Sequence, residues 1–208
     1  MPEPSPSGFD PAIRDYYDRA PEESRLELDV FRLEELRSRE LILRHAPAAP
    51  AVVLDVGGAA GAYAFWLAEE GYDVRLIDAV PRLVDVARRR NEHAAHPITS
   101  CRVADARALP EPSDSAAVVL MLGPLYHLVH AHDRQAALAE AARVLRPGGV
   151  VMAAGIARSA SALDGLAPRA AERSRVQSHR RRRPPRRAPS EPDRPTRLFH
   201  DRVFPSAR

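Results

Sequence analysis

Short apolar runs alternate with amphipathic segments along most of the chain. The runs have the length of buried parallel strands, and the segments between them place apolar residues three and four positions apart, as helices packed on a core do. This alternation predicts an α/β fold, an open and mostly parallel sheet with helices on both faces. The predicted strands are residues 51–56, 73–78, 99–104, 116–122 and 150–154, and the predicted helices are residues 10–19, 21–45, 60–70, 81–92 and 133–145.

Helix-capping residues mark where several of these elements begin and end. Pro21 and Pro81 suit the first turn of a helix, and Gly71 suits a left-handed cap after one. We expect Asp133 to cap the last predicted helix and the Arg-Pro-Gly-Gly sequence at 146–149 to end it. These signals place the helix boundaries between the predicted strands.

Charge divides the chain into two unlike parts. All 31 basic side chains are arginine, and 28 acidic residues leave a formal charge of +3 over 208 residues. Residues 167–208 hold 13 arginines and four acidic residues, a charge of +9, whereas residues 1–166 hold 18 arginines and 24 acidic residues, a charge of −6. The mild net charge is the average of an acidic body and a basic tail.

The basic tail, residues 167–208, also differs from the body in composition. Arginine and proline recur there and apolar periodicity stops, so we expect the tail to be disordered, as we expect of the Pro/Ser-rich residues 1–9. Three interpretations are open: an arm that binds nucleic acid, a solvated tail without a function, and the product of a shifted reading frame in a GC-rich gene. We favour the shifted frame, because the periodicity is lost abruptly.

Cysteine content and hydropathy exclude several classes of protein. The single cysteine, Cys101, excludes an internal disulfide and a cysteine-cluster zinc site, and it fits a reducing compartment. No apolar run reaches the roughly 18 residues that span a membrane, and the first residues lack a signal-peptide pattern. We expect a cytoplasmic protein without a membrane partner, and the sequence does not predict its oligomeric state.

Glycines and carboxylates follow three successive predicted strands. The first strand meets a glycine-rich turn at residues 57–61 and carries Asp55, the second ends at Asp78, and the third ends at Asp105. Glycines let a backbone turn tightly and approach a ligand, and a carboxylate at the end of a second strand can accept both ribose hydroxyls of a nucleoside. Because binding sites of such sheets lie at the carboxyl ends of the strands, the pattern predicts a nucleoside site.

Two other interpretations of this pattern compete with a nucleoside site. Taken singly, the glycines could form an ordinary turn and the acidic residues could cap helices. A nicotinamide dinucleotide site would require the spacing G-x-G-x-x-G, but Ala59 and Ala62 stand where glycines should follow Gly57. Asp55 would also repel a pyrophosphate, whereas it would attract a cationic ligand.

The chain resembles the class I S-adenosylmethionine-dependent methyltransferases between Val52 and Ile156. The resemblance rests on VVLDVGGAAGAYAFWLAEEGYDVRLIDAVPRLVDVARR, VADARALPEPSDSAAVVLMLGPLYHLV and AALAEAARVLRPGGVVMAAG, in that order. It implies a Rossmann-like domain with S-adenosyl-L-methionine as cofactor, and Ala59 departs from the glycine usual in the family. The implied cofactor residues are the loop Asp55, Gly57, Gly58, Ala59 and Gly61 around the methionine part, Asp78 at the ribose, Ala79, Asp105 and Ala106 at the adenine, and Leu122 on the methionine and substrate side.

The same resemblance implies an arrangement of domains and an acceptor side. Residues 10–46 resemble a helical cap that closes over the site, although an ordinary pair of surface helices fits them too. The methyltransferase domain is expected over residues 51–166, with five recognisable strands and the last two strands of the family missing. Tyr126 and His127 follow the fourth strand, where Tyr126 could orient the acceptor and His127 could act as a general base, or pack without a catalytic role.

The predicted activity is methyl transfer to an unidentified, small-molecule acceptor. Such transfer needs no metal, and we expect no metal site, because His130 and His132 lack further ligands nearby in the sequence. Nucleic acid is not the expected partner, although the basic tail leaves it open. The alternatives are a catalytically impaired, truncated nucleoside-binding relic and an RNA-associated methyltransferase that uses the tail.

Overall fold

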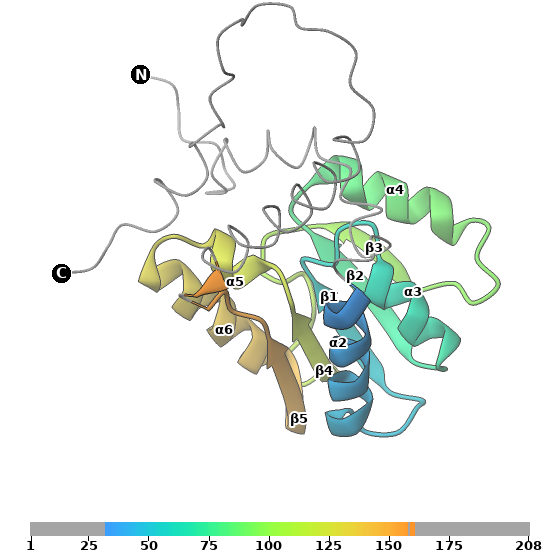
Figure 1. The fold of residues 1–208 in the computed structure, drawn as a ribbon, viewed down its shortest axis with the longest axis horizontal. Helices are drawn as coiled ribbons and strands as arrows, with labels where there is room; N and C mark the ends of the chain where they lie inside the picture. Colours follow the sequence, from blue (N-terminus) through green and yellow to red (C-terminus); the bar gives the residue numbers. More distant parts are fainter. Residues whose placement is uncertain (1–31, 158, 161–208) are drawn as a thin grey trace, which may run out of the picture. The chain divides into compact units, whose positions relative to one another are not determined.

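The computed structural model describes residues 32–157 and 159–160 of the chain (Figure 1). The chain divides into two compact units, residues 1–155 and 156–208, and all helices and strands named here belong to the first. In chain order these elements are α2 (Arg32–His45), β1 (Val52–Val56), α3 (Ala62–Glu69), β2 (Asp73–Asp78), α4 (Pro81–Asn91), β3 (Ser100–Val103), β4 (Ala116–Met121), α5 (Pro124–His127), α6 (Ala131–Val144) and β5 (Leu145–Ala153).

The five strands form one parallel sheet in the order β3-β2-β1-β4-β5, which places β1 at its centre. Val56 at the end of β1 is level with Ile77, and Asp78 at the end of β2 is level with Val103. The carboxyl ends of β1, β2 and β3 therefore meet at one edge. This arrangement confirms the predicted Rossmann-like α/β sheet.

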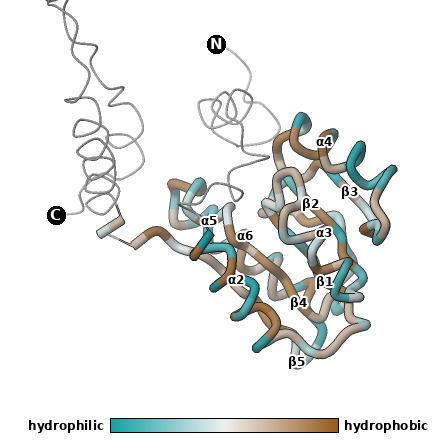
Figure 2. The backbone as a smooth tube through the Cα atoms, turned by 45° about the vertical axis from the view of Figure 1, so that its right-hand side comes forward, coloured by the Kyte–Doolittle hydropathy of each residue, from teal (hydrophilic) through white to brown (hydrophobic). Residues whose placement is uncertain are grey.

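Helices cover both faces of the sheet, as predicted. On one face Ile42 of α2, Phe65 and Leu67 of α3 and Val84 of α4 pack in a single buried cluster. On the other face Ala137, Ala141 and Val144 of α6 pack against Leu54 and Ile77 of the sheet, in a cluster that also includes Leu109 from the segment after β3. All six residues of β4 are buried, and the apolar colour follows this strand in Figure 2. Its continuous apolar sequence is thus that of a strand covered on both sides.

The predicted left-handed cap after α3 is confirmed. Gly71 has a φ of +90°, its N–H donates to the Ala68 carbonyl, and the Tyr72 N–H donates to the Leu67 carbonyl. This pair of bonds is a Schellman motif, which satisfies carbonyls that the end of a helix leaves unpaired. Pro81 likewise begins α4, as predicted.

Two predictions about the last helix and strand were wrong. The N-cap of α6 is His130, and Asp133 is the third residue of the helix, where its side chain pairs with Arg107. The last strand, expected over 150–154, begins earlier, because Leu145 directly after α6 already pairs with Ala116 of β4. Residues 146–149 then form a bulge opposite Ala117, since the next pair joins Val150 to Val118.

Several expectations fall on parts of the chain that the structure does not describe. They concern residues 1–9, the first part of the cap over 10–46, the boundary at 166–167 and the basic tail at 167–208. Among the residues that are described, no helix has the length and apolar character needed to cross a bilayer.

Candidate functional site

The glycine turn, residues 57–61, is fixed to the end of β2 by its own backbone. The N–H groups of Gly57 and Gly58 donate to the Ile77 carbonyl over 2.7 and 3.4 Å, and the N–H of Gly61 donates to the Gly58 carbonyl over 2.8 Å. Gly57 and Gly61 have φ values of +74° and +86°, in the left-handed region that favours glycine. The tight turn expected after the first strand is therefore present.

Each of three glycines in this turn lies against another part of the protein. A Cβ on Gly57 would come within 2.7 Å of Pro124, one on Gly58 within 2.6 Å of the Asp55 Oδ2, and one on Gly61 within 2.8 Å of the Phe65 ring. No real Cβ tolerates such distances. The glycine turn therefore requires glycine at these positions to pack against α5, β1 and α3, whether or not a ligand is bound.

Ala59 has a left-handed backbone with a φ of 49°. Its N–H donates to the Asp78 Oδ2 over 2.8 Å, which links the glycine turn to the end of β2. An alanine in this conformation costs about 1 kcal/mol relative to glycine. The hydrogen bond to a carboxylate offsets that cost, which is why an alanine can stand where the resemblance leads one to expect glycine.

Asp55 is a buried carboxyl group beneath the glycine turn, with 2% of its surface exposed. Its pKa is raised to about 7, first by burial and then by the charge of Asp78, while a hydrogen bond from the backbone N–H of Ala64 opposes the shift. Within residues 32–157, 159 and 160, the Asp55 Oδ2 finds no hydrogen-bond partner. Since Ala64 is the third residue of α3, this carboxyl group lies at the N-terminal end of a helix, where an anion is favoured.

Replacing Asp55 by asparagine is expected to change how stability depends on pH. A folded pKa of about 7, against 3.8 for the free side chain, means that the folded state holds a proton that the unfolded state loses. The stability contributed by this group is fully present below about pH 4 and is lost as the pH rises through 7. Between pH 4 and pH 8 the free energy of unfolding should therefore shift in favour of Asp55→Asn by on the order of 3 kcal/mol.

Urea denaturation of both proteins across this pH range measures the difference. Asparagine keeps an oxygen for the Ala64 N–H and carries no charge at any pH, so the comparison isolates the ionisation of Asp55. Parallel stability curves for the two proteins would contradict the raised pKa.

Asp78 ends β2 with both carboxylate oxygens held by backbone groups. Oδ2 accepts the N–H of Ala59, and Oδ1 accepts the N–H of Val80 over 2.8 Å, which also places Ala79 in a tight turn beside the site. Burial raises the pKa of Asp78, and the two backbone hydrogen bonds counteract the shift. Each oxygen still has a lone pair available, so the group can accept hydrogen bonds from a pair of hydroxyls.

Asp105 lies two residues beyond β3, with Ala106 buried beside it. Its carboxylate is bound by Arg107, whose Nε donates to Oδ1 over 2.9 Å and whose Nη2 donates to Oδ2 over 2.6 Å. Burial alone would raise the pKa of Asp105, but the hydrogen bonds and charge of Arg107 lower it below its usual value. The Asp-x-Arg spacing is the signal in the sequence for the pairing of Asp105 with Arg107, and the sequence analysis missed this pairing.

The acceptor side predicted from the sequence lies at the end of β4. Leu122 and Gly123 connect β4 to the short helix α5, and the hydroxyl of Tyr126 donates to the Leu122 carbonyl over 3.2 Å. His127 packs edge-on against the Tyr126 ring, and burial lowers its pKa to about 4. At neutral pH its imidazole is therefore uncharged, and it is a weak base.

Metal ligands do not gather anywhere in the part of the chain that the structure describes: no group of three or more His, Cys, Asp or Glu side chains is placed to hold an ion. The rings of His130 and His132 stack on each other with centroids 5.4 Å apart.

The structure combines a parallel sheet of this order, a glycine turn after its central strand and a carboxylate at the end of the next strand. These features are typical of nucleoside-binding α/β domains. Residues 53–149 match the family model described as a methyltransferase domain. The sheet and the candidate site therefore lie in a segment that is similar to methyltransferase domains.

Individual proteins are also similar to this chain, in sequence or in fold. An uncharacterized methyltransferase of Mycobacterium tuberculosis H37Rv is 39% identical over 103 residues, which are 50% of this chain and 39% of that protein. A SAM-dependent methyltransferase of Leishmania major has a similar fold, with a TM-score of 0.58 at 16% identity over 72% of this chain and 64% of that one. Phosphoethanolamine N-methyltransferase 1 of Haemonchus contortus, solved with phosphoethanolamine and S-adenosylhomocysteine, also has a similar fold. Its TM-score is 0.53 at 24% identity, over 65% of this chain and 29% of that one. The match to the curated relative thus spans about two fifths of its length.

Proposed function

We propose that this chain binds S-adenosyl-L-methionine at the carboxyl ends of β1, β2 and β3 and transfers its methyl group to a small-molecule acceptor. The supporting observation is that the N-terminal end of α3 is already compensated by a buried carboxyl group, Asp55. In dinucleotide-binding sheets that helix end holds a pyrophosphate. Here the N–H groups of Gly57, Gly58 and Ala59 are also engaged by the protein, so the turn favours a ligand without phosphates.

The proposal assigns each part of the cofactor to side chains that fit it. Asp78 would accept the two ribose hydroxyls, Ala79 would lie against the adenine, and Asp105 with Ala106 would contact its edge. The glycine turn would enclose the methionine part, with Ala59 at its closest approach. A positive charge above the turn would favour the ionised form of Asp55, whose Oδ2 accepts no hydrogen bond from the residues that the structure describes. A cationic ligand therefore suits this turn.

Bound S-adenosyl-L-methionine supplies a methyl group already activated by the sulfonium. The chain's own residues have to hold the acceptor in line with that methyl and keep water away. Leu122 and Gly123 would form the apolar wall between the two ligands. Tyr126 would orient the acceptor, while His127, with a pKa of about 4, would accept a hydrogen bond rather than remove a proton at neutral pH.

Isothermal titration of the full chain with S-adenosyl-L-homocysteine and with NAD⁺ tests the proposal. We expect S-adenosyl-L-homocysteine to bind and NAD⁺ not to bind, because the pyrophosphate would meet the helix end that Asp55 occupies. Binding of NAD⁺ by a folded sample that ignores S-adenosyl-L-homocysteine would overturn the proposal. Transfer of a labelled methyl group to members of a small-molecule panel would then identify the acceptor.

A further inference from the structure

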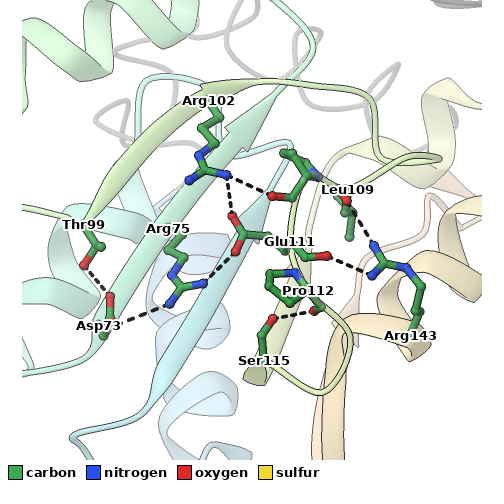
Figure 3. Close-up of polar contacts among 10 residues, drawn as sticks. Asp73, Arg75, Thr99, Arg102, Leu109, Glu111, Pro112, Ser115 and Arg143 are labelled. Atoms are coloured by element: carbon green, nitrogen blue, oxygen red, sulfur yellow. Dashed lines mark hydrogen bonds and ion pairs between the residues drawn. The ribbon is translucent and has the colours of Figure 1, made fainter.

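One face of α6 holds the segment that connects β3 to β4, residues 104–115, which we call the β3–β4 loop. Glu140 accepts the N–H of Leu109 over 2.8 Å, and Arg143 donates to the carbonyls of Leu109 and Glu111 over 3.0 and 2.8 Å. Figure 3 shows these contacts of Arg143, together with the ion pairs that Glu111 makes with arginines of β2 and β3. The far end of the loop is thereby tied to the helix and to the sheet.

The near end of the same loop is tied to α6 by an ion bridge. The guanidinium of Arg107 binds both oxygens of Asp105, and its Nη1 donates to the Asp133 Oδ1 over 2.7 Å. These three side chains are only 18%, 18% and 15% exposed, for Arg107, Asp105 and Asp133 in turn. A shielded pair of this geometry is stronger and more rigid than an exposed ion pair.

We propose that Arg107 is a positioning residue that fixes the Asp105 carboxylate for recognition of the adenine amine, with Asp133 of α6 holding Arg107 in turn. The inference rests on the proposed function, because it presumes a nucleoside at the strand ends. Asp105 Oδ1 accepts two donors, the backbone N–H and Nε of Arg107, whereas Oδ2 accepts one, Nη2. Each carboxylate oxygen can accept two hydrogen bonds. Arg107 therefore fills both acceptor positions of Oδ1 and one of Oδ2, which leaves one position on Oδ2 for a ligand N–H.

Arginine is suited to this task in a way that lysine is not. Its planar fork binds a carboxylate through two parallel hydrogen bonds, so the plane of the Asp105 carboxylate is set before a ligand arrives. The same contacts, against the effect of burial, lower the pKa of Asp105 and keep the group an acceptor in mildly acidic solution. A recognition group that is already ordered binds its ligand with a smaller loss of conformational entropy.

The test compares two ligands that differ only in the base. S-adenosyl-L-homocysteine carries the exocyclic amine, whereas S-inosyl-L-homocysteine carries a carbonyl oxygen there, which a carboxylate repels. The wild-type full chain should prefer the adenine ligand by about 100-fold, the range expected when a buried charged group loses its partner. In Arg107→Ala and Arg107→Lys this preference should fall about tenfold, since Asp105 is no longer held in one plane.

Arg143→Ala is the matched control. It removes hydrogen bonds from the same loop and the same helix face, but at the end away from Asp105. We expect it to lower the melting temperature while the preference for adenine stays at the wild-type value. Asp133→Asn, which keeps the shape of the side chain and removes its charge, should lower the preference by a smaller factor than Arg107→Ala, and it serves as the test if Arg107→Ala does not fold.

The outcomes separate this inference from the proposed function. A folded wild-type chain that binds neither ligand overturns the proposed function. A wild-type chain that binds both ligands equally overturns the role of Asp105 and of Arg107 while the site itself stands. An unchanged preference in the Arg107 variants, or an equal fall in Arg143→Ala, overturns the positioning role of Arg107.

Discussion

Replacing Asp78 by alanine is expected to weaken the binding of S-adenosyl-L-homocysteine by about 100-fold or more. Under the proposed function the variant loses the acceptor of two ribose hydroxyls, and each hydrogen bond to a charged group contributes about 1.5–3 kcal/mol. It also frees the N–H groups of Ala59 and Val80, so the glycine turn loses its link to β2. Isothermal titration below the melting transition measures the loss.

Asp73→Ala is the control for this experiment. Asp73 begins the same strand that Asp78 ends, and its side chain is 41% exposed and bonded to Thr99 at the opposite end of the sheet. Removing it should leave the affinity for S-adenosyl-L-homocysteine unchanged. Equal affinities of Asp78→Ala and the wild-type chain would place the ribose elsewhere.

The second large effect is expected from Gly58→Ala, which should destabilise the fold by about 3 kcal/mol and abolish cofactor binding. The new Cβ would lie 2.6 Å from the Asp55 Oδ2 and 3.2 Å from the Asp55 carbonyl oxygen. Neither atom can retreat, because Asp55 is buried in the central strand. Such overpacking costs about 1–3 kcal/mol or more. If the glycine turn moves away from Asp55 to relieve the clash, the segment that would enclose the cofactor is displaced.

A double variant identifies the cause. In Gly58→Ala combined with Asp55→Ala the two closest contacts, with Oδ2 and Cγ, no longer exist, so the combined loss of stability should be smaller than the sum of the two single losses. Gly155→Ala is the control, since a Cβ there meets no atom of the described residues within 4 Å. Chemical denaturation of these variants and the wild-type chain measures the stabilities, and strict additivity would rule out the clash.

Apolar patterning was sufficient to predict the sheet and failed where glycine and proline interrupt it. The uninterrupted run of β4 and the capped helices α3 and α4 lie within one or two residues of their predicted positions. The predicted start of the last strand at residue 150 was wrong, because Leu145, on the far side of Pro147 and the two glycines, already pairs with Ala116 of β4. Pairing between strands is a non-local interaction, and local signals do not reveal it.

The candidate site could be located from the sequence, but its internal contacts could not. The order of Asp55, Asp78 and Asp105 at successive strand ends indicated one edge of the sheet, since parallel strands bring their carboxyl ends together. The burial of Asp55 beneath the glycine turn depends on packing around Gly58, and the hydrogen bond from Arg107, the partner of Asp105, to Asp133 of α6 spans 26 residues of chain. Contacts of this kind arise from the fold as a whole.

The central place of β1 has a consequence for redesign. Under the proposed function the nucleoside is held on the β2 and β3 side of that strand, while the acceptor is met on the β4 and α5 side. A library of substitutions confined to residues 122–128 would therefore vary the choice of acceptor and leave the ribose and adenine contacts in place. One position limits such a library: Pro124 lies directly against Gly57, so it has to be kept while its neighbours are changed.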